Sequence, residues 1–178
     1  FQGYLNCVYF SPDDLKLVKG GPSERRRFMD LELSQVNPYY RHALSQYNKV
    51  LQQRNNLLKE MRIDLDLLDV FNEQLVETGT VVIERRRNML LRLNLLAKLL
   101  QRKLTELKEN LSLEYLPSFE IENDVKEDFR KALEKSYEDE RQRGYTLIGP
   151  HRDDFSMLID DLDVRVFGSQ GQQRTVVL

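Results

Sequence analysis

The 178-residue sequence has a single cysteine and no tryptophan. With only Cys7, a framework of internal disulfides is excluded, and no segment resembles a secretory leader, so a cytoplasmic protein is expected. The longest unbroken apolar run covers residues 7–10. A bilayer span needs roughly 20 residues, so no membrane segment is expected. Cys7 itself is interpreted as a small core residue.

Neither sign of charge dominates the chain. It carries 27 Lys and Arg against 29 Asp and Glu, for a formal charge of −2. This balance excludes a globally basic nucleic-acid binder but leaves local basic patches open. Charged residues make up 31% of the sequence, above the usual value of about 25%, which indicates much solvated helical surface.

The first 37 residues predict a strand followed by two short helices. Residues 1–3 are interpreted as the remnant of a cleavable tag, and the apolar residues 5–10 predict a strand. The motif Ser11-Pro12-Asp13-Asp14 is typical of a helix start. The Gly20-Gly21-Pro22 break should end that helix, and Ser23 is expected to cap a second helix over 24–33.

Residues 38–110 are predicted to form a helical arm. Apolar residues at helical spacing predict one helix over 39–61 and another over 65–107. Because so few residues join them, the two helices are expected to pack antiparallel as a hairpin. The pattern at Gly79 is compatible with either one continuous helix or a single bend. The leucine stripes are interpreted as core and arm packing, with partner binding as the alternative.

Residues 111–178 are predicted to combine short strands, one helix and a strand-to-helix loop. Asp124 and Glu127 have the spacing of a capping pair and predict a helix to about Arg143. Strands are expected at 111–115, 119–121, 145–148, 155–159 and 164–167. The expected fold class is therefore α+β and predominantly helical, an antiparallel arm hairpin plus a small β element. The sequence stops at Leu178, inside a predicted helix, which suggests a piece of a longer protein.

The strand-to-helix junction at Gly168-Ser169-Gln170-Gly171 carries the sharpest functional signal. Glycines let the backbone approach a ligand closely, and Ser169 adds a hydroxyl. The free N–H groups and positive end of the following helix attract an anion such as phosphate. The alternative is a structural turn in which Ser169 only caps the helix.

Five segments together carry a family resemblance. They are Phe10-Ser11-Pro12-Asp13-Asp14-Leu15-Lys16-Leu17-Val18-Lys19-Gly20, Arg25-Arg26-Arg27-Phe28, Tyr47-Asn48-Lys49-Val50-Leu51, Gly149-Pro150-His151-Arg152-Asp153-Asp154 and Gly168-Ser169-Gln170-Gly171-Gln172-Gln173-Arg174-Thr175. In this order they resemble the RecF family of DNA-repair ATPases, which is similar to the two-lobed ABC and SMC-type ATPases. The resemblance implies that this chain is the second, arm-bearing lobe, with residues 4–37 joining it to an ATP-holding lobe.

The resemblance also assigns roles to the junction. Ser169, Gln170, Gly171 and Gln172 would occupy the place of the ABC signature motif, usually Ser-Gly-Gly-Gln, from which Gln170 departs. In such ATPases the signature contacts the γ-phosphate of ATP held by the other subunit, so ATP joins a homodimer. The motif Gly-x-x-x-x-Gly-Lys-Ser/Thr is absent, as is a Walker B carboxylate after the junction. The resemblance implies that the whole protein binds ATP and Mg²⁺. Because this chain lacks both motifs, the chain alone should bind no cofactor and hydrolyse no ATP.

Three other side chains are candidates to support the nucleotide interface: His151, Arg152 and Arg174. His151 and Arg152 could instead hold the turn around Gly149-Pro150. A metal site is not expected, because the only other histidine is His42.

Two arginine runs, residues 25–27 and 85–87, are the densest basic segments. Three consecutive arginines on a helix fan around it, which favours solvated side chains paired with nearby carboxylates, namely Glu24, Asp30, Glu77 or Glu84. Contact of Arg25, Arg26 and Arg27 with DNA phosphates is the alternative.

The resemblance further implies a role in recombinational repair, replication and the SOS response, in which the parent protein binds DNA and helps RecR and RecO to load RecA on gapped DNA. A second possible function is an interaction module whose arm docks a partner such as RecR. A third is a purely structural helical hairpin.

Overall fold

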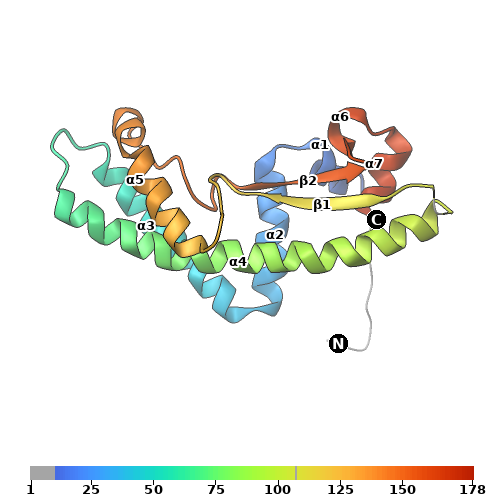
Figure 1. The fold of residues 1–178 in the computed structure, drawn as a ribbon, viewed down its shortest axis with the longest axis horizontal. Helices are drawn as coiled ribbons and strands as arrows, with labels where there is room; N and C mark the ends of the chain where they lie inside the picture. The colour runs from blue at the N-terminus through green and yellow to red at the C-terminus, as the bar shows by residue number, and fades with distance from the viewer. Residues whose placement is uncertain (1–10, 107) are drawn as a thin grey trace.

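The computed structural model describes residues 11–106 and 108–178, and the long helix α4 runs along most of its length (Figure 1). The predicted strand at 5–10, residues 1–3 and Cys7 lie outside the described residues. The described elements are η1 (Pro12–Leu15), α1 (Lys16–Lys19), α2 (Pro22–Val36), α3 (Pro38–Leu57), α4 (Leu65–Leu104), β1 (Leu111–Leu116), α5 (Val125–Arg143), β2 (Asp154–Ile159), β3 (Leu162–Asp163), α6 (Val164–Phe167) and α7 (Gln170–Val177). The predicted class, a mainly helical α+β fold, is confirmed.

Helix starts follow the local capping signals, with one correction. Helix α2 begins at Pro22 and not at residue 24, because proline fits the first helical position and Gly21 serves as the N-cap. The helix also extends to Val36, beyond the predicted end. Asn37 then caps α3, its Oδ1 accepting a hydrogen bond from the backbone N–H of Tyr40 at 3.0 Å.

Helices α3 and α4 form the predicted antiparallel hairpin. Every seventh residue of α3 meets a residue of α4, and the partner's number falls as the α3 number rises. The facing pairs are Tyr40 with Arg86, Tyr47 with Gly79 and Arg54 with Asn72. Helix α3 ends at Leu57 and not near residue 61, because Leu57 and Leu58 turn inward and pack on Leu68.

Gly79 provides a close approach and not a bend. Helix α4 is continuous over 40 residues, about 60 Å at 1.5 Å per residue. A Cβ at position 79 would lie 2.6 Å from Cε1 of Phe129 in α5 and 3.0 Å from Cε2 of Tyr47 in α3. Glycine therefore lets three helices meet at one point.

The second half of α4 packs under the sheet. Strand β2 pairs antiparallel with β1 and β3, in a register that places Leu111 opposite Ile159. Alternate residues of β2 are buried, and its inward side chains join Leu90 of α4 in one core. Asp160 and Asp161 both have positive φ and make the turn between β2 and β3.

Three predicted strands are wrong. Residues 119–121 are irregular, because Phe119 stacks on the Phe129 ring (5.1 Å between centroids) and not in the sheet. Residues 145–148 are also irregular, since side chains satisfy their backbone: Asn55 accepts from the Thr146 N–H at 2.7 Å. Residues 164–167 form helix α6, because Asp163 caps it by accepting from the backbone N–H of Arg165.

Candidate functional site

The loop between α6 and α7 has two glycines with different roles. At Gly168 a Cβ would lie 2.5 Å from the Val164 carbonyl oxygen, so packing requires glycine there. A Cβ at Gly171 would meet only Ser169 Oγ, at 3.8 Å, outside its own helix and chain neighbours. The packing of the described residues thus leaves room for a Cβ at Gly171, and the lack of a side chain there keeps the exposed first turn of α7 open.

Ser169 caps α7 through a reciprocal pair of hydrogen bonds. Its Oγ accepts from the Gln172 N–H at 3.2 Å, while Gln172 Oε1 accepts from the Ser169 N–H at 2.8 Å. The structural interpretation of Ser169 as a cap is therefore correct. This cap is compatible with phosphate binding by the same residue, because the Ser169 hydroxyl accepts one bond and still has a proton to donate. Gln170 and Gly171 are exposed beside it.

How the loop is held from behind was not predicted from the sequence. Gln172 Nε2 donates to Glu109 Oε1 at 3.0 Å, and Gln101 Nε2 donates to Glu109 Oε2 at 2.6 Å. Gln101 lies in α4 and is only 2% exposed. In the sequence, the one sign of this contact is a glutamine that follows the leucine-rich part of the helix. The first turn of α7 is thereby tied to the end of the long helix.

His151 and Arg152 lie elsewhere. They precede β2 while Ser169 follows its far end, and six residues of strand span roughly 20 Å. His151 Nε2 is 3.1 Å from the Thr146 carbonyl and its Nδ1 is 2.6 Å from the Tyr47 hydroxyl. Burial lowers the pKa of His151 to about 4. Within one chain, His151 and Arg152 therefore hold the turn around Gly149-Pro150 and do not form one site with the loop at Ser169. The third candidate, Arg174, is exposed on α7.

The first arginine run splits into three environments. Arg25 is 3% exposed, and its guanidinium binds both carboxylate oxygens of Asp154 at 2.7 and 2.8 Å. Arg26 is half-buried and donates to the Asp153 carbonyl at 2.8 Å, whereas Arg27 is exposed. The expected pairing of Arg25 with Glu24 or Asp30 is wrong. Its burial also argues against contact with DNA.

The second run is divided in the same way. Arg86 is 2% exposed and bonds to Asp30 at 2.7 Å and to the Pro150 carbonyl at 2.6 Å. Asp30 was among the predicted partners, but the arginine that it pairs with lies 56 residues away in sequence. Arg85 and Arg87 remain at the surface.

A buried ion pair that the sequence interpretation missed joins α3 to α5. Arg54 Nη2 lies 2.7 Å from Glu140 Oε2, and both side chains are fully buried. Arg54 also donates to Asn72 and Thr146, and Glu140 Oε1 accepts from the Leu147 N–H at 2.8 Å. This network fixes the irregular segment after α5 against the hairpin.

Residues 11–106 and 108–178 contain no group of three or more His, Cys, Asp and Glu side chains that could hold a metal ion. Over the same residues, no helix is long and apolar enough to pass through a bilayer.

Comparisons with known proteins identify the class. No protein-family model matches the chain. It is 50% identical over 181 residues to the DNA replication and repair protein RecF of Alkaliphilus oremlandii, covering 99% of this chain and 50% of that protein. For RecF of Halothermothrix orenii the identity is 48%, with the same coverage. The solved structure of the recombination mediator protein RecF-ATP in the RecFOR pathway matches with a TM-score of 0.89 and 37% identity, over 94% of this chain and 47% of that one.

The matches thus place the chain among relatives that are named DNA replication and repair proteins. The chain belongs to the RecF family, as the sequence resemblance predicted. It spans about half the length of the curated relatives it matches.

Proposed function

We propose that this chain is the arm-bearing signature lobe of a RecF protein, and that Ser169 and Gly171 contact the γ-phosphate of ATP bound by a second subunit. The first turn of α7 supports this proposal, because it is exposed and begins at a serine hydroxyl. It also contains a glycine, Gly171, that the packing of the described residues does not require.

The chemistry of this turn suits a phosphate. The first N–H groups of a helix have no intrahelical partner, so those of Gln170 and Gly171 add two donors to the Ser169 hydroxyl. The positive end of the helix dipole favours a negative charge at the same place. The bonds from Gln101 and Gln172 to Glu109 hold the turn in one orientation, so little ordering is needed when the phosphate arrives.

The whole protein would supply what this chain lacks. We infer that the complementary half holds ATP with Mg²⁺, that ATP joins two subunits head to tail, and that the dimer acts on DNA with RecR and RecO to load RecA. The names of the relatives, which are DNA replication and repair proteins, and of the RecF-ATP structure support this assignment. The alternative of an arm that docks a partner such as RecR stays a prediction.

A chimera tests the phosphate contact. In it, this chain replaces the matching half of Alkaliphilus oremlandii RecF; we call this protein the RecF chimera. Ser169→Arg should abolish ATP-dependent dimerisation and ATP turnover while ATP binding to the other half persists. Val166→Arg, which adds the same charge at an exposed position of α6, is the matched control. If Ser169→Arg dimerises with ATP as the control does, the proposal is wrong.

A further inference from the structure

The outer side of the second half of α4 is an exposed leucine face. It consists of two rows at i, i+4 spacing, Leu91-Leu95-Leu99 and Leu96-Leu100-Leu104, with side chains that are 57% to 67% exposed. The opposite side of the same helix is buried under β1, where Leu90 enters the core and Asn94 accepts from the Leu113 N–H at 2.9 Å. Among the described elements none covers the leucine face (Figure 1).

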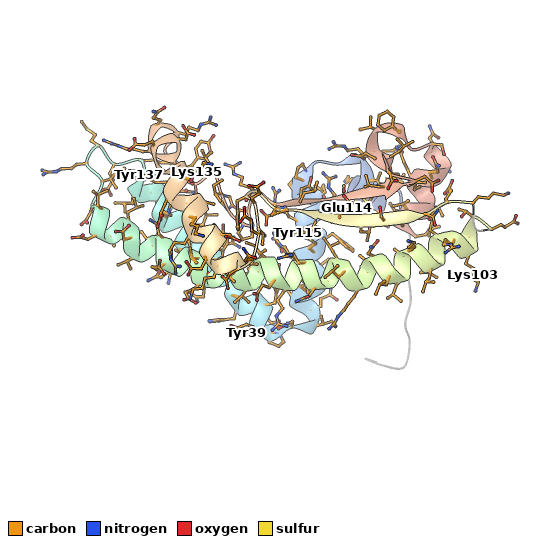
Figure 2. All side chains as sticks on the ribbon, in the orientation of Figure 1. Tyr39, Lys103, Glu114, Tyr115, Lys135 and Tyr137 are labelled. Atoms are coloured by element: carbon orange, nitrogen blue, oxygen red, sulfur yellow. The ribbon has the colours of Figure 1, made fainter. Side chains whose placement is uncertain are left out.

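Cations accompany these leucines. From Arg85 to Lys103 the helix has no carboxylate, and the exposed charges are all positive: Arg85, Arg87, Arg92, Lys98, Arg102 and Lys103. Figure 2 shows Lys103 near the C-terminal end of α4. Three of them, Arg85, Arg92 and Lys103, follow spacings of 7 and 11 residues and so line up along the helix between the two leucine rows. The complementary surface is therefore apolar and acidic or neutral.

We propose that the leucine face is the docking surface for the half of a RecF protein that this chain does not match. The relatives contain about as many residues again as this chain covers, so a body of similar size has to be placed against it. Six leucines on one side of a helix, each more than half exposed, are typical of an interaction surface and not of a solvated helix. Both described ends of the chain, η1 and α7, lie at the same end of the molecule as the leucine face (Figure 1).

Other occupants fit less well. A second copy packed through the same face would bring the line of cations on one copy against the same line on the other, and like charges oppose this arrangement. A DNA backbone would pair with the cations but would leave the six leucines against phosphates. An apolar, acidic protein surface satisfies both kinds of side chain.

Cysteine labelling tests the proposal. Leu100→Cys is prepared in a Cys7→Ser background, both in this chain alone and in the RecF chimera, and its reaction with a maleimide is timed without nucleotide. The control is Leu65→Cys, because Leu65 starts the same helix and is 57% exposed, as Leu100 is. In the chimera, Leu100→Cys should react roughly tenfold or more slowly than in the chain alone, since burial limits access to the thiol. Leu65→Cys should react equally fast in both.

Each other outcome overturns the proposal. Equal reaction of Leu100→Cys in the two proteins shows that the other half does not cover the face. Protection in the chain alone that increases with concentration assigns the face to a second copy. Protection in the chimera only after ATP is added assigns it to the partner subunit. Because the labelling uses no nucleotide, Ser169→Arg can fail or succeed independently of it.

Discussion

The buried pair between Arg54 and Glu140 yields the sharpest test of how the arm is built. Replacing Arg54 with Met removes the cation and leaves the Glu140 carboxylate fully buried without its counter-charge. It also removes the donors to Asn72 and Thr146, at 2.8 and 2.7 Å. Breaking one side of a buried pair typically costs about 3–5 kcal/mol, so we expect the free energy of unfolding of Arg54→Met to fall by that amount.

The size of the effect depends on burial, and the chain provides a matched control. Arg130 of α5 binds Glu73 of α4 through two bonds of 2.7 and 2.9 Å, but these side chains are 28% and 54% exposed. Arg130→Met should therefore cost much less stability than Arg54→Met, because solvent screens an exposed pair. Urea unfolding followed by far-UV circular dichroism measures both variants under the same conditions.

A double-mutant cycle then separates the pair from its surroundings. Glu140→Gln keeps an acceptor for the Leu147 N–H while removing the charge. The double variant Arg54→Met/Glu140→Gln should be more stable than the sum of the single losses predicts, by about 1–3 kcal/mol. If the single losses simply add, or if Arg54→Met costs no more than Arg130→Met, the pair does not stabilise the junction in the way we describe.

Three further predictions concern glycines and pH. Gly79→Ala should destabilise the chain by about 1–2 kcal/mol, although alanine favours helices, because its Cβ would overlap Phe129; an increased urea midpoint would contradict this. Gly168→Ala should lower the unfolding midpoint whereas Gly171→Ala should leave it nearly unchanged, and equal midpoints for the two variants would remove the distinction between them. His151 has a folded pKa of about 4, below that of the unfolded chain, so protons bind the unfolded state preferentially. The free energy of unfolding should then fall by up to about 3 kcal/mol as the pH is lowered from 6.5 to 4. If a His151→Gln variant loses stability with the same dependence on pH, His151 is not the cause.

Much of the fold could be predicted because its signals are local. The side chains of Asn37 and Asp124 accept from backbone N–H groups three residues further on, and the Asp14 carboxylate accepts from the Ser11 N–H, so these capping signals are visible in a short window of sequence. The apolar period of α4 likewise predicts a helix without knowledge of its neighbours. The same holds for the loop at Ser169, whose capping partner is Gln172.

The strand errors had different causes. Residues 145–148 have strand-like composition, but their backbone is held by Asn55, 91 residues from Thr146. Residues 164–167 also have strand-like composition, but the local cap at Asp163, directly before them, makes them helical. A β propensity describes packing on a sheet, and it loses meaning where no sheet neighbour is present.

By itself, the sequence determined the long helices α3, α4 and α5, the helix start at Asp124 and the family. Only the tertiary structure decided which arginines are buried, because Arg25 finds its carboxylate on Asp154, 129 residues away. It also decided that Gly79 is a point of close contact and that one face of α4 stays open. Periodicity places side chains on a common face of a helix, but whether that face is covered depends on long-range packing, which no short window of sequence contains.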